Sequence, residues 1–155
     1  MEPIPVTPRL EHLCRGEVQL GEMLRAGESP FGERRVIPIT GGRFEGKLAG
    51  EVLPGGADSQ WVRPDGTVVV DARYMIKTSD GAIVYIHNHG LRAGPRKVIE
   101  RMLRGESVDP SSYYFRTTPE FETGSPKYAW LNNIVAVCSA SRLANSVILD
   151  FYTVL

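Results

Sequence analysis

Charged residues two positions apart in strand-like segments are the first feature of this sequence that could do chemistry. Asp71 and Arg73 form one such pair, and Arg116 shares its parity with Glu120 and Glu122. Side chains at this spacing point to the same face of a strand. If that face were enclosed, desolvated carboxylates would have shifted pKa values and the arginines would hold an anionic or enolic ligand. If it faced water, the same residues would form weak surface ion pairs.

Three carboxylates are candidates for a general acid or base: Asp58, Asp71 and Glu122. Asp58 lies on a Gly-rich turn shortly before Trp61, a setting that can raise the pKa of a carboxyl group, although the cap of an Asx turn explains Asp58 equally well. The residues expected to hold and orient a substrate are Arg73, Tyr74, Tyr113, Arg116, Tyr128, Trp130 and Asn132. Such a set suits cofactor-free isomerisation, cyclisation, dehydration or lyase chemistry.

Two histidines, His87 and His89, share a strand face as two ligands of a metal site would. His12 lies on a different predicted strand, and the next glutamate along the chain, Glu100, falls in a predicted helix. Solvent-facing histidines are therefore favoured over a metal site. The sequence also has no Gly-x-Ser-x-Gly nucleophile motif and no phosphate-binding glycine loop. We expect neither a metal nor a cofactor.

Val and Ile, which suit pleated strands, outnumber Leu in this sequence. We therefore expect short strands to position these residues. The predicted strands are 10–19, 34–39, 43–53, 58–62, 67–78, 82–89, 113–118, 134–139 and 146–154. Asp-Gly turns at 65–66 and 80–81 make their flanking strands antiparallel, and residues 21–30 are predicted as a polar loop. Residues 95–104, between Pro95 and Gly105, predict one short amphipathic helix.

Eight or nine antiparallel strands with one helix favour a closed β-barrel, because closure removes exposed sheet edges. Gly46 and Gly50 would supply the bends that closure needs. A two-sheet sandwich is the alternative. Which face of each strand points into the barrel stays open at this level.

Length and charge restrict the function further. The 155 residues suit a single domain, 1–155, and the 18 basic residues balance the 18 acidic ones. A net charge of zero argues against nucleic-acid and membrane-surface binding. The first residues lack a secretion signal, and no apolar run is long enough to span a bilayer. We expect a cytoplasmic protein.

Seven short motifs occur in an order that resembles a known family. They are Gly41-Gly-Arg-Phe-Glu-Gly46, Leu53-Pro-Gly-Gly-Ala-Asp58, Asp71-Ala-Arg-Tyr74, Thr78-Ser-Asp-Gly-Ala82, Tyr114-Phe-Arg-Thr117, Phe121-Glu-Thr-Gly124 and Tyr128-Ala-Trp-Leu-Asn132. The set is similar to the family of domain of unknown function thirty-two thirty-seven, from about Arg9 to Leu155. The resemblance implies a single-domain antiparallel barrel like the calycin or allene-oxide-cyclase barrels, and it implies no mechanism.

Three functional hypotheses follow. The first is an enzyme, a cofactor-independent isomerase, cyclase or lyase acting on a small oxygenated organic acid or carbonyl compound. The second is a carrier or sensor that binds a small apolar molecule unchanged. The third is an assembly module with a solid interior, and a homodimer is expected in any case. The enzyme is the favoured hypothesis.

Overall fold

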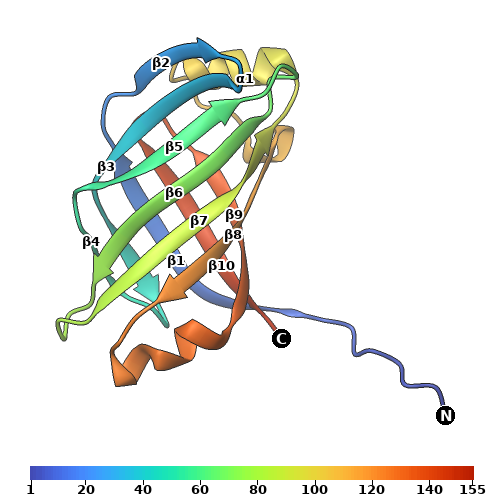
Figure 1. Cartoon of the computed structure of the whole chain (residues 1–155), viewed down its shortest axis with the longest axis vertical. Helices are drawn as coiled ribbons and strands as arrows, with labels where there is room; N and C mark the ends of the chain where they lie inside the picture. The colour runs from blue at the N-terminus through green and yellow to red at the C-terminus, as the bar shows by residue number, and fades with distance from the viewer.

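Ten β-strands dominate the structure, a computed structural model that describes residues 1–155 (Figure 1). They are β1 (Leu10–Leu20), β2 (Leu24–Ser29), β3 (Gly32–Gly46), β4 (Gly50–Val52), β5 (Gly56–Val62), β6 (Val68–Lys77), β7 (Ile83–Ala93), β8 (Tyr114–Glu122), β9 (Val135–Arg142) and β10 (Ser146–Val154). The helix α1 (Arg96–Leu103) follows β7, and the 3-10 helices η1 (Pro110–Ser112) and η2 (Pro126–Asn133) flank β8. None of these helices is long and apolar enough to cross a membrane.

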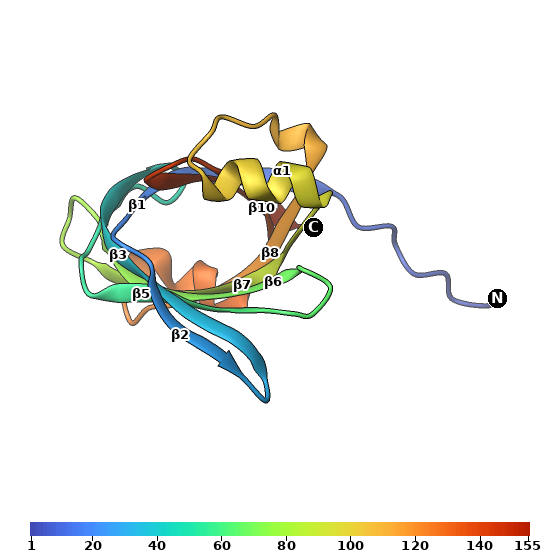
Figure 2. The ribbon, with the colours of Figure 1, turned by 90° about the horizontal axis from the view of Figure 1, so that it is seen from above.

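The strands close into an antiparallel barrel, which Figure 2 shows along its axis. Pairing runs β1-β10-β9-β8-β7-β6, and β5 and β4 then fill successive parts of the gap between β6 and β3. β3 pairs with β1 and completes a ring of eight strands, with β2 and β4 as extra strands. The predicted closed barrel is therefore confirmed, and the sandwich alternative is wrong.

β3 is longer than predicted and joins two of the predicted strands. Residues 33–39 pair with β5, and the rest of the strand pairs with β1. Gly42 lies in the second part at a φ of 134°, and a Cβ atom there would lie 2.0 Å from the carbonyl oxygen of Glu17. Only glycine fits so close an approach of two strands, so this residue helps the barrel to close.

Two elements differ from the sequence prediction. Residues 21–30 are not a plain loop, because they contain β2, which forms a hairpin with β3. Almost all of β2 is exposed, so it lacks the alternating pattern that reveals a strand. The predicted helix 95–104 corresponds to α1, but η2 was missed because its sequence has no apolar stripe.

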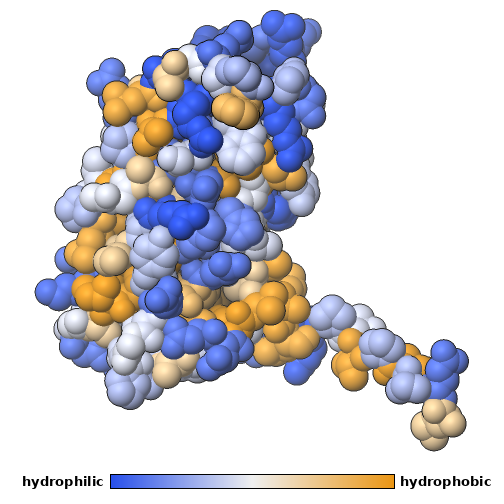
Figure 3. All heavy atoms as spheres, viewed as in Figure 1, coloured by the Kyte–Doolittle hydropathy of each residue, from blue (hydrophilic) through white to orange (hydrophobic).

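Alternation along the strands separates the inside of the barrel from the outside. In β6, the buried residues are Val68, Val70, Ala72, Tyr74 and Ile76, and the residues between them are partly or largely exposed. The charged residues of β6 and β8 therefore lie on the outer wall. This agrees with the interpretation that they form weak ion pairs at the surface. Figure 3 shows the resulting surface, on which hydrophilic and hydrophobic residues are interspersed.

The two ends of the interior differ in composition. The end that η2 covers, at the bottom of Figure 1, is packed with aromatic rings and aliphatic side chains. The rings of Phe44 and Phe151 stack there with centroids 5.4 Å apart, and Phe121 meets Phe151 edge-on. The opposite end, where α1 lies along the rim, contains most of the buried polar side chains.

Candidate functional site

A small pocket lies inside the barrel at the end near α1 and the β2–β3 hairpin. Its wall is mainly aliphatic, with Val18, Ile37, Ile39 and Val70 among its residues. The polar side chains that reach it come from five strands and are Asp58, Gln60, Tyr74, Asn88, Arg92, Thr117 and Arg142. The positions open to the centre of a water molecule amount to about 40 Å³, which is room for a few waters.

Asp58 is the only carboxylate in this pocket, and the protein fixes both of its oxygens. The side-chain amide of Gln60 donates to Oδ2 at 2.7 Å, and the backbone N–H of Asp71 donates to Oδ1 at 2.9 Å. Burial raises the pKa of Asp58, and these two hydrogen bonds and Arg92 oppose the rise. A carboxyl group in such a setting suits the uptake and release of a proton.

Three arginines surround this carboxyl group. Burial lowers the pKa of Arg35, Arg142 and Arg92, in the last case to about 10. Arginine side chains keep their charge in proteins. Arg35 donates from Nε to the Gln60 side-chain oxygen at 3.0 Å and so orients the amide that holds Asp58. None of the three forms a salt bridge. The site therefore carries more positive than negative charge.

Four side-chain atoms that are fully buried in this protein lack a hydrogen-bond partner. They are Tyr74 Oη, Asn88 Oδ1, Arg92 Nε and Thr117 Oγ1. All four residues line the pocket beside Asp58. Buried polar atoms are nearly always paired in folded proteins, so a cluster of unpaired ones marks a place where water or a ligand completes the bonding.

The family to which the chain belongs follows from a match over almost its whole length. The sequence profile described as "Protein of unknown function (DUF3237)" matches residues 8–154. The chain belongs to the DUF3237 family. The resemblance inferred from the seven motifs is thus confirmed.

Two curated relatives and one solved structure are similar to this chain over most of its length. The UPF0311 protein blr7842 of Bradyrhizobium diazoefficiens is 47% identical over 152 residues, which cover 97% of this chain and all of that protein. The crystal structure of RPA1785 from Rhodopseudomonas palustris superposes with a TM-score of 0.92 at 42% identity, covering 98% of this chain and 100% of that one. A more distant relative, "Hydroalkoxylation enzyme phnH" of Penicillium herquei, is 26% identical over 150 residues, covering 97% of this chain and 86% of that protein.

The residues singled out in this DUF3237 sequence fall into three places. Asp58 and Tyr74 line the pocket. Tyr113 lies close by: its hydroxyl group accepts the backbone N–H of Arg142 at 3.1 Å and donates to Ser141 at 3.4 Å. One predicted acid–base candidate and two predicted tyrosines therefore lie at the polar end.

The other residues lie elsewhere. The side chains of Asp71, Arg73, Arg116 and Glu122 are on the outer wall, since they alternate with the inward residues of β6 and β8. The η2 residues Tyr128, Trp130 and Asn132 lie at the opposite end. There Tyr128 is part of the core, Trp130 is exposed, and the Asn132 side chain bonds to the Thr123 backbone. The predicted residues therefore do not meet in one site.

Sequence analysis missed Arg35, Gln60, Asn88, Arg92 and Arg142. A signal for two of them is present in β7, where Asn88 and Arg92 share the parity of the buried Val84 and Ile86. In β3, Arg35 likewise shares the parity of Ile37 and Ile39. Single polar residues on an otherwise apolar strand face mark a buried polar site better than a face that is charged throughout.

Proposed function

We propose that this protein is an enzyme that catalyses cofactor-independent proton transfer on a small organic anion in the polar end of its barrel. One observation carries the proposal: the unpaired buried polar atoms all surround a single buried carboxyl group. A solid structural interior would pair these atoms or replace them with apolar groups, because each unpaired one costs about 1–3 kcal/mol.

The charge of the site supports an anionic substrate. Arg92, at 4% exposure, has an Nε–H group without a partner, and the carboxyl group in the same pocket, Asp58, is already bonded by Gln60 and Asp71. A buried charge without a partner is costly, and an anionic ligand would remove that cost. Carboxylates, phenolates and enolates present oxygens that a guanidinium group binds well.

In the proposed reaction Asp58 moves the proton and Arg92 binds the negative oxygen. The substrate is oriented by the hydroxyl groups of Tyr74 and Thr117 and by the side-chain carbonyl oxygen of Asn88. Of the reactions that the residues suit, intramolecular addition of a hydroxyl group to a C=C bond fits best. Asp58 gives its proton to one alkene carbon, the hydroxyl oxygen bonds to the other carbon, and the hydroxyl proton returns to Asp58. The product is an isomer of the substrate, so no cofactor is consumed.

The name of the Penicillium herquei relative supports this choice, because hydroalkoxylation is the addition of a hydroxyl group across a C=C bond. Binding sites for small molecules usually hold about 300–1,000 Å³, more than this pocket offers as it stands. Substrate entry is therefore proposed at the partly exposed pocket residues Leu20 and Val147, where rotation of the side chains would have to enlarge the pocket.

The test uses a panel of alkenyl phenols and unsaturated hydroxy acids. Binding is measured by isothermal titration calorimetry. Conversion is followed by chromatography, as the appearance of a product with the same mass as the substrate. Asp58→Asn should keep binding and lose at least 100-fold in turnover, in line with typical contributions of general acids and bases. Arg92→Met should lose binding of the anionic compounds. The proposal would be overturned if wild type and Arg92→Met each bound anionic and neutral analogues equally well.

A carrier is the competing function, and the same assay separates the two. A carrier returns every bound compound unchanged, and its Asp58→Asn variant differs from wild type in affinity alone.

A further inference from the structure

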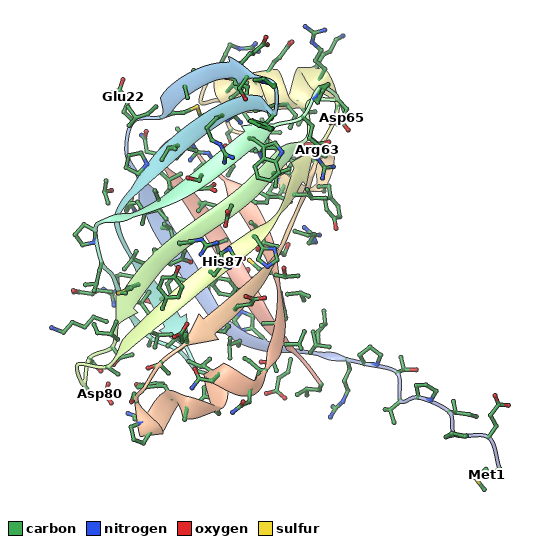
Figure 4. All side chains as sticks on the ribbon, in the orientation of Figure 1. Met1, Glu22, Arg63, Asp65, Asp80 and His87 are labelled. Atoms are coloured by element: carbon green, nitrogen blue, oxygen red, sulfur yellow. The ribbon has the colours of Figure 1, made fainter.

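A second cluster of chemically competent side chains lies on the outer wall of the barrel, across β6, β7 and β8. His87 and His89 are two residues apart on β7 and share its outer face. Strand register places Glu120 of β8 opposite His87 and Asp71 of β6 opposite His89. Figure 4 shows His87 on the outer side of this wall. The cluster is separate from the interior site, because these side chains point away from the pocket.

The donor atoms of three of these residues converge. His87 Nδ1 lies 3.8 Å from one oxygen of Glu120, and His89 Nε2 lies 3.8 Å from the other. The two imidazole rings are neighbours, with centroids 4.9 Å apart. One donor atom from each residue can be chosen so that all three lie within 4.8 Å of one another. Ligands about 2.0–2.2 Å from a tetrahedral ion are about 3.4 Å apart, so small side-chain rotations would close the set around one ion.

Asp71 supplies the support that a metal-binding histidine usually has. Its Oδ1 atom lies 2.6 Å from His87 Nε2, which leaves Nδ1 of the same ring directed at Glu120. Histidines that bind metals commonly donate their second N–H group to a carboxylate, which fixes the ring orientation. The guanidinium group of Arg73 lies 3.7 Å from the same Asp71 oxygen. The two carboxylates of Asp71 and Glu120 therefore exceed this one positive charge.

We propose that His87, His89 and Glu120 form a binding site for a divalent transition metal ion, with Zn²⁺ as the best match. Two imidazole nitrogens and one carboxylate oxygen are a common zinc ligand set, and they leave a fourth position for water or another ligand. The position is open, since His89 and Glu120 are well exposed. The sequence of β7 alone does not reveal this site, because its third ligand comes from the neighbouring strand.

The test titrates tag-free full-length protein with Zn²⁺ by calorimetry, and Co²⁺ absorption reports the coordination geometry. Wild type should bind one equivalent. His89→Ala should lose at least 100-fold in affinity, Glu120→Gln at least tenfold, and Asp71→Asn 10- to 100-fold by loosening His87. Circular dichroism verifies that each variant is folded.

His12→Ala is the matched control, because His12 is also exposed and lies 3.0 Å from a carboxylate, Asp150, without a second histidine nearby. It should bind Zn²⁺ as wild type does. Absence of binding in wild type, or equal affinity in wild type and His89→Ala, would overturn the proposal. A loss in His12→Ala as large as in His89→Ala would also overturn it, because it would place the ion elsewhere.

Discussion

The two ends of the barrel interior are built from the same strands but differ in what they bury. Towards η2, fully buried residues such as Phe44, Phe151 and Ile76 fill the space with apolar contacts. Towards α1, inward-facing positions are instead occupied by Asp58 and Arg92, beside polar atoms that have no hydrogen-bond partner. The first end stabilises the fold through apolar packing, whereas the second keeps arginines and unpaired polar atoms in a buried place. Under the proposed function, binding belongs to the polar end only, and the packed end provides the rigid support.

The largest effect is expected at the packed end. Phe44→Ala removes a ring that stacks on Phe151 and covers Gly16, where even a Cβ atom would lie 2.7 Å from the ring. It should lower the free energy of unfolding by about 3–5 kcal/mol, as measured by urea denaturation, because the strands around the cavity cannot collapse into it. Phe31→Ala is the control, because Phe31 is exposed on the β2–β3 hairpin and should have little effect. Equal losses in both variants would remove the distinction between core and surface.

The polar end should respond with the opposite sign. Arg92→Met replaces a buried guanidinium group with an unbranched apolar chain, shorter than arginine, that can still pack on Phe115. We expect the free energy of unfolding to rise by about 1–3 kcal/mol in urea denaturation, because an unpaired buried polar group is removed, while binding of anionic compounds is lost. Arg116→Met, on the outer face of β8, is the control and should change neither property. A marked loss of stability in Arg92→Met would mean that Arg92 supports the fold and is not a binding group.

The sequence was sufficient for the architecture because the relevant signals are local. Turn residues such as Asp65-Gly66 and Asp80-Gly81 act over a few positions, and both turns formed as predicted, with Gly66 and Gly81 at positive φ. Closure follows from strand number and from the exclusion of free edges. The weak point was β2, whose exposed residues carry no burial pattern.

The candidate site could be predicted only in part, because it depends on which strand face points inward. The sequence predicts the site largely on the charged faces of β6 and β8, but the interior is formed by the apolar faces, on which Asn88 and Arg92 are isolated exceptions. Which residues meet also depends on register between strands far apart in sequence. Glu120 opposite His87 is an example, since these neighbours in the sheet lie 33 positions apart in the sequence.

The pH dependence of stability provides a finer test of the polar end. Because burial raises the pKa of Asp58, the folded state binds a proton that the unfolded state has already released. Stability should therefore fall as pH rises from the ordinary aspartate pKa through the raised value, by at most about 1.4 kcal/mol per pH unit for one proton. Urea denaturation of wild type and Asp58→Asn across this range isolates the effect, since the other groups cancel in the difference. A difference that grows in the opposite direction would show that hydrogen bonds, and not burial, control this carboxyl group.

The smallest effects are expected on the outer wall, and they decide whether the charged parity takes part in catalysis. Arg116 and Glu122 are exposed on β8, on the opposite side of the sheet from the pocket residue Thr117. Exposed charges contribute little to stability because water and salt screen them. Arg116→Gln and Glu122→Gln should therefore leave both the urea midpoint and the turnover close to wild type. A large loss of turnover with an unchanged midpoint would return these residues to the active site and place the reaction on the outer surface. That result would reverse the contrast between the two ends, because the polar interior would then serve structure and the wall would serve chemistry.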